Sequence, residues 1–342
     1  MSQPKILEPQ CVWTEQDIAD PSTWIVQLTD ADLVEIDAAL AVAKTRSDDF
    51  LALTKADFPL PTVAAKLAEI EAELMNGKGF TLIRGLPREQ YSNDELCLIY
   101  WGMGMYLGKP WPQNKHGHLL GDVTDQGRSP TDPTARGYEL GEVALPFHCD
   151  GSDLVGLLCL DKGRDGGESA IANSVAAYNR MVEERPDLAA ELFKPLPYDY
   201  RGEEAPGSKG WYTMPVFTEF DNRLFVRYIP SYIRASQRHD DAPRLTSKEL
   251  EAMDYFEAIY NDPKYHVYMQ MQPGDMQFIN NYHVLHGRKA YSDAKAEGKV
   301  RHLKRLWLET TQLEDRPAHF TNFTAKHWGD KPTISRMDAE RA

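Results

Sequence analysis

A histidine and an aspartate one residue apart are the first side chains in this sequence that could do chemistry. His148 and Asp150 lie in the stretch FHCDGSD, between apolar segments at 143–147 and 154–160. In an extended strand, residues two apart project from the same face, so these two side chains could bind one cation while Cys149 points away. An unpaired charge is costly in an apolar region. The pair is therefore a candidate for part of a metal site.

A third ligand could come from the stretch GDMQFINNYHVLHGRKAY, which carries His283 and His286 at the far end of an apolar run. Two histidines and one carboxylate form a facial triad that leaves coordination positions open, and this donor set is typical of non-haem Fe(II) oxygenases. The spacing does not choose between the two histidines. Whichever is not a ligand is expected to be a core histidine bonded to a backbone carbonyl.

Two other histidine-containing pairs compete for a metal role. His116 and His118 form the H-x-H pair of many zinc hydrolases, which keeps a metal-dependent hydrolase as the alternative enzyme class. The further ligands of those hydrolases are missing from the sequence that follows, so a loop is the simpler interpretation. His239 and Asp241 lie in a polar stretch beside a proline, which predicts a solvated loop.

The segments that position these residues are short apolar or alternating runs separated by Gly, Pro, Asn and Asp, a pattern typical of antiparallel strands. We expect strands over residues 79–87, 153–160, 168–174, 223–229, 275–287 and 301–309. Such a chain is mainly β, and we expect a sandwich or barrel with helices packed outside it.

Helices are predicted before the strands and between them. Residues 29–45 and 61–79 repeat apolar residues at helical spacing, and 91–108 opens with a Ser/Asn/Asp cap. Two further helical stretches, at 175–193 and 246–262, interrupt the strands.

The domain organisation is expected to be simple, because no repeat or low-complexity block divides the sequence. We expect a single domain over residues 1–342. It would comprise a helical N-terminal region at 1–78, a β core with the two helical insertions at 79–320, and a C-terminal tail at 321–342.

Composition narrows the classes of partner. The chain has 38 basic and 52 acidic residues and a formal charge of -14, which opposes binding to nucleic acid or to anionic membranes. It begins without a secretory signal and contains no run of about 18 apolar residues. Its four cysteines form no C-x-x-C pair. We expect a cytoplasmic protein with a small-molecule substrate, which could form a homo-oligomer.

Four motifs in order resemble the taurine dioxygenase (TauD/TfdA-like) family of Fe(II)/2-oxoglutarate oxygenases. They are FHCDGSDLVGLLCL, GGES, PGDMQFINNYHVLHGR and RHLKRLWLE, within a match over about residues 79–320. The resemblance implies a double-stranded β-helix (jelly-roll) core. It also implies a dioxygenase that oxidises a C–H bond of a small molecule with O2 and releases succinate and CO2. A non-catalytic jelly-roll binding protein remains the non-enzyme alternative, because a fold does not determine function.

The same resemblance assigns residues to the metal and to the cosubstrate. His148, Asp150 and His286 match the ligands of the catalytic Fe(II), which places His283 second. Ser169 stands where many members of the family have threonine, and its hydroxyl would bond to the carboxylate of 2-oxoglutarate. Arg301 matches the arginine that pairs with that carboxylate.

The assignment for the substrate is coarser. Arg305 matches an arginine that, in several members, meets an anionic group of the substrate, so we expect an acidic or zwitterionic molecule. Arg301 and Arg305 are four apart on an expected strand and share a face, and a planar guanidinium suits a carboxylate. Gln113, Asn114 and Tyr138 lie in segments that could line the mouth of the site. Hydroxylation is the default outcome, and desaturation and ring closure stay open.

Overall fold

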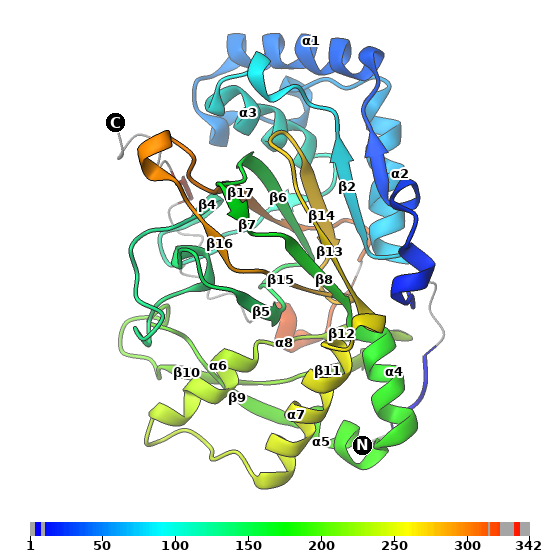
Figure 1. Ribbon diagram of the computed structural model, residues 1–342, viewed down its shortest axis with the longest axis vertical. Coiled ribbons are helices and arrows are strands. Elements are labelled where there is room, and N and C mark those ends of the chain that lie inside the picture. The colour runs from blue at the N-terminus through cyan, green and yellow to red at the C-terminus, as the bar shows by residue number, and fades with distance from the viewer. Residues whose placement is uncertain (1–3, 8–10, 314, 322–331, 336–342) are drawn as a thin grey trace.

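Two β-sheets face each other at the centre of the molecule (Figure 1). The computed structural model describes residues 4–7, 11–313, 315–321 and 332–335. The larger sheet has the strand order β1-β2-β14-β6-β17-β4-β18, with β3 also paired to β17. Its strands are β1 (Ile25–Gln27), β2 (Phe80–Arg84), β3 (Lys109–Pro110), β4 (His118–Thr124), β6 (Leu154–Asp161), β14 (Met276–Asn280), β17 (His302–Glu309) and β18 (Thr333–Ile334).

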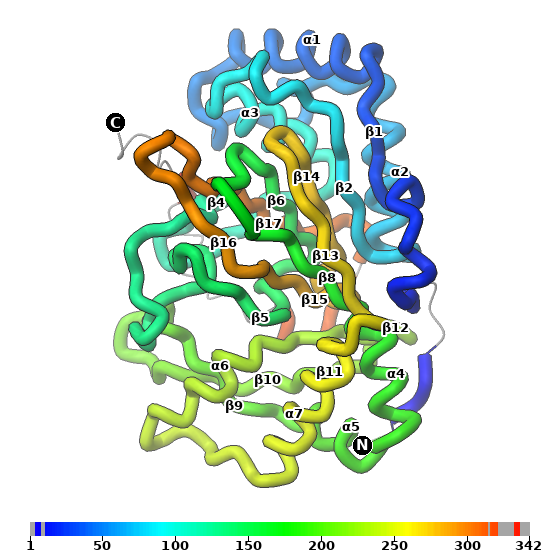
Figure 2. The backbone as a smooth tube through the Cα atoms, in the orientation of Figure 1, coloured from blue at the N-terminus to red at the C-terminus, as the bar shows by residue number. Residues whose placement is uncertain are grey.

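The smaller sheet has the order β13-β8-β15-β5. Its strands are β5 (Leu145–His148), β8 (Ser169–Asn173), β13 (His266–Met269) and β15 (Val284–Arg288). Three further pairs form separate two-stranded sheets: β7 (Asp165–Gly166) with β16 (Tyr291–Ser292), β9 (Pro195–Asp199) with β10 (Trp211–Pro215), and β11 (Phe217–Phe220) with β12 (Arg223–Val226). The tube in Figure 2 shows how segments distant in the sequence, such as β5 and β15, come to lie side by side.

Helices cover the outer faces of both sheets. Figure 1 shows α1 (Asp30–Arg46), α2 (Val63–Asn76) and α3 (Asn93–Gly104) at one end of the molecule, and they pack on the larger sheet through one apolar cluster. A second cluster joins the smaller sheet to α4 (Ser174–Glu184), α5 (Pro186–Leu192) and α7 (Ser247–Tyr260). The short helices α6 (Pro230–Ala235) and α8 (Ala318–Thr321) complete the set.

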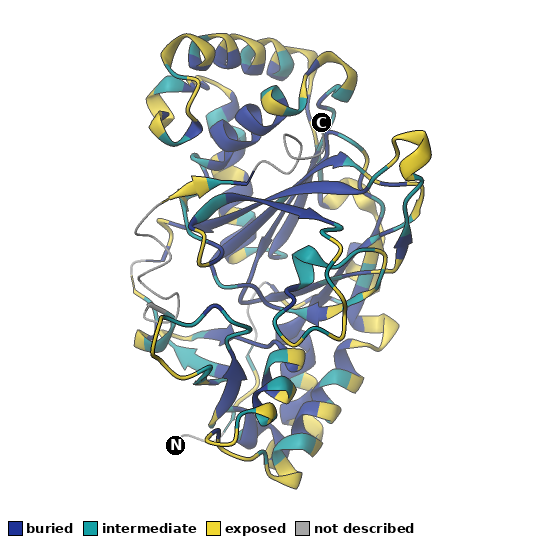
Figure 3. Cartoon of the chain, turned by 90° about the vertical axis from the view of Figure 1, so that its left-hand side faces the viewer, coloured by how far each residue is buried: buried dark blue, intermediate teal, exposed yellow. Residues whose placement is uncertain are grey.

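The alternation of side chains along β17 shows how the core is divided. Leu306 and Leu308 point outward into the cluster beneath α1–α3, whereas Leu303 and Trp307 point inward, between the sheets. Figure 3 shows these central strands as buried and the helices as exposed on their outer sides. Arg305 is two residues from both Leu303 and Trp307, so it points inward as they do. A charged group therefore enters the space between the sheets.

Two of the expected elements differ from the structure. Residues 275–287 form two strands, because Asn280 and the residues after it turn the chain from the larger sheet into the smaller one; Tyr282 N donates to Asn280 Oδ1 at 3.0 Å. The helical stretch expected over 175–193 is split at Arg185, since Pro186 cannot continue a helix from the preceding turn.

The expectations on fold class, domain number and membrane helices have separate outcomes. The mainly β fold with flanking helices is observed, and most of the expected tail at 321–342 lies outside the described residues. That residues 1–342 fold as a single domain stays a prediction. None of the helices in the described ranges has the length and apolar character needed to cross a bilayer.

Candidate active site

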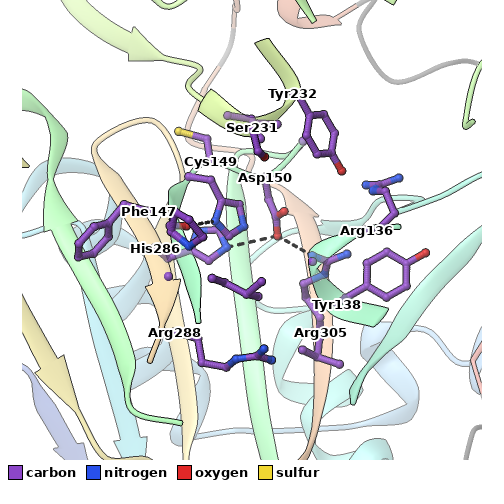
Figure 4. Close-up of a pocket in the computed structure, with 18 of the residues that line it drawn as sticks. Arg136, Tyr138, Phe147, Cys149, Asp150, Ser231, Tyr232, His286, Arg288 and Arg305 are labelled. Atoms are coloured by element: carbon purple, nitrogen blue, oxygen red, sulfur yellow. Dashed lines mark hydrogen bonds and ion pairs between the residues drawn. The ribbon is translucent and has the colours of Figure 1, made fainter. Parts of the chain in front are cut away.

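Two histidines and a carboxylate converge at the end of the smaller sheet, facing the larger one (Figure 4). Strands β5 and β15 are antiparallel neighbours, and His148 and His286 are partners in their register. One ligand atom from each of His148, Asp150 and His286 lies within 4.8 Å of the others. Within the described ranges, this is the group of His, Cys, Asp or Glu side chains that meets the geometry of a metal site.

The carboxylate reaches this position in a way that strand alternation does not explain. Strand β5 ends at His148, so Asp150 lies in the following turn, and the expected two-residue spacing on one strand face was wrong. The turn is held by Asn281: Asp150 N donates to Asn281 Oδ1 at 2.7 Å, and Asn281 Nδ2 donates to Asp150 O at 2.8 Å. Cys149 points away, as expected, with its Sγ 3.5 Å from Val226 O.

A backbone carbonyl holds His148 in the tautomer that a metal ligand needs. His148 Nδ1 lies 2.8 Å from Pro146 O, and because a carbonyl only accepts, this nitrogen carries the proton and Nε2 keeps its lone pair. Burial, together with the neighbouring His286, lowers the pKa of His148 to about 4, so the ring is neutral at physiological pH. His286 Nδ1 is buried and has no hydrogen-bond partner among the described residues.

The carboxylate is oriented by two donors from β17. Arg305 Nη1 and Trp307 Nε1 each donate to Asp150 Oδ2 at 2.9 Å, which leaves Oδ1 for a cation. Burial alone would raise the pKa of the Asp150 carboxyl, but the charge of Arg305 holds it well below its usual range. Two imidazoles and an ionised carboxylate with one oxygen to spare are a donor set that fits Fe(II).

A second feature of the same pocket is a pair of buried guanidiniums. Arg301 Nη2 donates to Gly167 O at 3.3 Å, and its Nη1 has no partner among the described residues. Arg288 donates from Nη2 to two backbone carbonyls, and its Nε and Nη1 likewise have none. Burial and the charge of Arg301 lower the pKa of Arg288 to about 10. Because like charges are held together here, the pair suits an anion such as a carboxylate.

Gly167 explains part of the GGES motif. Its φ is +71°, and a Cβ at this position would lie 2.7 Å from Arg301 Nε, so glycine is needed both for the turn and for the space that the guanidinium occupies. Ser169 is the register partner of Arg288, and its hydroxyl is 2.9 Å from Gln277 Oε1. The serine therefore lies beside the guanidinium pair, with its proton directed to Gln277.

Comparison with known proteins decides the family. Residues 46–307 match the model of the family described as taurine catabolism dioxygenase TauD, TfdA family. The chain belongs to this family. It is a 2-oxoglutarate-dependent dioxygenase, with Fe(II) as its metal and O2 as the oxidant.

Relatives and solved structures agree with this placement. The dioxygenase is 31% identical over 323 residues to FR-33289 synthase of Streptomyces rubellomurinus, covering 94% of both chains. Its fold is similar to that of the non-heme iron oxygenase OrfP in complex with Fe and alpha-ketoglutaric acid, with a TM-score of 0.63, 18% identity and coverage of 84% and 93%. Asparagine oxygenase in complex with Fe(II), 3-hydroxyasparagine and succinate gives a TM-score of 0.62 at 18% identity, with coverage of 83% and 93%. The jelly-roll core is thereby confirmed.

The residues expected at the substrate fall into two groups. Arg305 and Tyr138 line the pocket that holds the dioxygenase's histidine–aspartate cluster. Gln113 and Asn114 line an adjoining cavity instead. Gln113 Oε1 accepts from Arg305 Nε at 2.8 Å and its Nε2 donates to Arg305 O at 2.7 Å, so it supports that arginine from behind. Asn114 Nδ2 lies 3.0 Å from His118 Nδ1. Neither residue lines the pocket of the cluster itself, and a role for them at the substrate stays a prediction.

The competing histidines lie apart from the cluster. His283 is buried, lines a different cavity and has a backbone hydrogen bond to Leu224, as expected of a core histidine; its Nδ1 also lies 3.2 Å from Asn280 Nδ2. His116 and His118 have ring centroids 5.6 Å apart, and neither is in the described cluster. His239 Nε2 lies 3.3 Å from the buried Asp199, a closer packing than a solvated loop predicts.

The sequence-based expectations missed Arg288 and Arg136, which both line the pocket. A signal existed for Arg288, because it follows His286 by two residues on the same strand and so shares its face. Arg136 lies in the long connection between β4 and β5, where periodicity offers no signal.

Proposed function

We propose that this dioxygenase hydroxylates a C–H bond of a small acidic or zwitterionic molecule, with His148, Asp150 and His286 as the ligands of Fe(II). The observation that carries the proposal is the opening of this donor set into a pocket of about 140 Å³ that is rich in arginine. A pocket of this size suits a metabolite rather than a polymer. In the net reaction, one oxygen atom of O2 enters the substrate and the other enters succinate, while 2-oxoglutarate loses CO2.

Different residues of the chain would bind the cosubstrate and orient the metal ligand Asp150. Fe(II) with 2-oxoglutarate, when bound, supplies the oxidising power. Arg301 and Arg288 would hold the distal carboxylate of 2-oxoglutarate, because both line the pocket with Ser169 and carry N–H groups without a partner among the described residues. Trp307 and Arg305 keep Asp150 ionised and oriented. Precise orientation matters because small displacements of reacting groups cost large factors in rate.

The substrate class is supported by charge. Arg305 uses Nε and Nη1 for Gln113 and Asp150, which leaves Nη2 for a ligand in the pocket. The solved complex of asparagine oxygenase, which has a similar fold, contains a hydroxylated amino acid and succinate. An amino acid or another small acid is therefore the class of substrate we propose for this chain.

The test is a screen of amino acids and small carboxylic acids for release of succinate that depends on the added compound. We expect at least one acid to raise the rate, and mass spectrometry should find a product that has gained one oxygen atom. A product that has lost two hydrogen atoms instead would replace hydroxylation by desaturation or ring closure. Release of succinate that no acid or amino acid stimulates would contradict the proposed substrate class.

A further inference from the structure

Arg136 lies at the active-site pocket but belongs to none of the motifs. It precedes the short 3-10 helix Gly137–Glu139 in the connection between β4 and β5, and its side chain is among those that line the pocket with the metal-binding cluster. It is 8% exposed. Its backbone N–H donates to Glu139 Oε2 at 2.7 Å, so the chain at this point is held in place. Figure 4 shows Arg136 beside Tyr232, on the side of Asp150 away from Arg288.

A single tyrosine ring brings Arg136 together with Arg305. The guanidinium carbon of Arg136 lies 5.6 Å from the centroid of the Tyr138 ring, and that of Arg305 lies 5.2 Å from the same centroid. Tyr232 lies 5.9 Å from Arg136 on a further side. Cation–π contacts of this kind hold a guanidinium in place without neutralising its charge. Two cations from separate segments are thus fixed around one ring.

The charges of the pocket lining do not balance. The lining contains five arginines, Arg136, Arg227, Arg288, Arg301 and Arg305, but only two acids, Asp150 and Asp199. Asp199 is already paired with Arg238, a residue outside the lining. Arg136 has Glu203 as a partner outside the lining, but at 3.4 Å, longer than the roughly 2.7–2.9 Å of a tight charge-assisted bond. The side chains of the lining therefore carry three more positive than negative charges.

Bound Fe(II) and 2-oxoglutarate do not remove this excess. The metal adds two positive charges and the cosubstrate two negative charges, and Asp150 becomes a metal ligand. Arg301 and Arg288 are assigned to the cosubstrate. Of the three remaining arginines, Arg136 and Arg305 lie around Tyr138, where an anionic ligand would relieve their charge.

We infer that Arg136 and Arg305 form a two-arginine corner that binds the oxyanionic group of the substrate, with Tyr138 and Tyr232 packing against its carbon skeleton. This inference rests on the proposed function, and it specifies which end of the substrate is recognised. The ligand chemistry is a group with at least two acceptor oxygens, such as a carboxylate or a sulfonate. Arg136 is then a determinant of specificity that acts together with Arg305.

The experiment compares Arg136→Met with a matched control, Arg201→Met. Arg201 lies 5.0 Å from the ring of Tyr232 but is not among the residues that line the pocket. The probes are amino acids and C3–C6 acids, each with its carboxamide and its sulfonate analogue. Arg136→Met should raise the KM of the acid probe at least tenfold while changing kcat and the KM of the amide by less than about twofold. Arg201→Met should change neither KM, and the Kd of 2-oxoglutarate, measured by calorimetry, should be unchanged in both variants.

Several results would overturn the inference. An equal loss for the acid and its amide would mean that Arg136 only supports the wall of the pocket. A parallel loss of 2-oxoglutarate affinity would place Arg136 in the cosubstrate site. The KM of the sulfonate analogue, compared with that of the acid, shows whether the corner selects a carboxylate or accepts both oxyanions. If Arg136→Met does not fold, Arg136→Lys retains the cation and should give a smaller increase in KM that is still confined to the acid.

Binding without turnover separates this inference from the proposed function. Saturation-transfer NMR detects binding of the same probes in the absence of O2. Some acids could bind to the wild type, bind weakly to Arg136→Met and never be oxidised. That result would support the two-arginine corner and contradict the proposed hydroxylation. Acids that bind no better than their amides would contradict the corner itself.

Discussion

His148 and His286 are register partners on the adjacent antiparallel strands β5 and β15, and their ring centroids lie 4.4 Å apart. The spacing of the two imidazoles is therefore set by backbone hydrogen bonding between strands rather than by flexible loops. Gly287 contributes to this closeness, because a Cβ on it would lie 2.7 Å from Leu145 O and 3.3 Å from Phe147 N. A site built on paired strands holds its ligands more rigidly than a site built on loops.

Gly287→Ala should separate β5 from β15 and weaken metal binding, because the new methyl group would press on the backbone of Leu145. We expect a loss of stability of about 1–3 kcal/mol and a weaker Kd for Co(II), a spectroscopic substitute for Fe(II). Gly137→Ala is the control, since its Cβ would meet only side-chain atoms of Leu145, at 3.4 Å and beyond. Unchanged Co(II) affinity in Gly287→Ala would show that strand pairing does not set the site.

His286→Ala should abolish metal-dependent succinate formation, because it removes one of three proposed ligands. His283→Gln should retain it, since His283 lies in a different cavity and a glutamine can still bond to Asn280. Metal content after dialysis and succinate release measure the two effects separately. Retained metal in His286→Ala, with loss in His283→Gln, would reverse the choice of ligand.

Arg301→Ala should weaken the binding of 2-oxoglutarate by about 2–5 kcal/mol, the usual effect of removing one partner of a buried charged pair. Ser169→Ala should cost only about 1 kcal/mol, because one hydrogen bond is lost and the hydroxyl already has a partner in Gln277. Isothermal titration gives both values. If the serine variant lost more than the arginine variant, the anchor of the cosubstrate would have to lie elsewhere.

Trp307→Phe should weaken metal binding about 10–100-fold, the usual range when a group that orients a metal ligand is lost. The change keeps an aromatic ring in the core but removes the N–H that donates to Asp150 Oδ2. Trp101→Phe is the matched control, because the buried Trp101 Nε1 has no hydrogen-bond partner among the described residues. Equal Co(II) affinities in the two variants would assign Trp307 to packing alone.

Asp122→Asn should destabilise the protein in a pH-dependent way. Burial would raise the pKa of Asp122, but a hydrogen bond from His302 and the charge of Lys304 hold it well below its usual range. A carboxyl with a depressed folded pKa stabilises above its unfolded value, about 3.9, and this contribution is lost as the pH falls. At pH 7 we expect a loss of about 3–5 kcal/mol, because the buried Lys304 loses its counterion.

The gap in Tm between the wild type and Asp122→Asn should therefore be largest near pH 7 and begin to narrow below about pH 5. Asp240→Asn, at a fully exposed position, should leave the Tm within about a degree of the wild type at every pH. A gap that widens on acidification would contradict the assignment of a depressed pKa to Asp122.

The sequence by itself determined the elements and the chemistry-bearing motifs. Periodicity placed α1, α2, α3 and α7 and the strands β2, β6, β8, β12, β14, β15 and β17, because the side chains that face a core recur at the period of the element. The H-x-D pair, the GGES stretch and the two arginines of RHLKRLWLE were visible because their residues are close together in the chain. The family, and with it the reaction, followed from the order of these motifs.

Only the tertiary structure decided which groups face one another. Asp150 lies in a turn held by Asn281, and Gln113 supports Arg305 from behind the pocket; both depend on contacts over more than a hundred residues of sequence. Arg136 meets Arg305 around Tyr138 because the connection between β4 and β5 folds over the larger sheet. Local periodicity reports whether a side chain is buried, whereas its partner depends on strand order, register and the path of the loops, which are set by the packing of the whole chain.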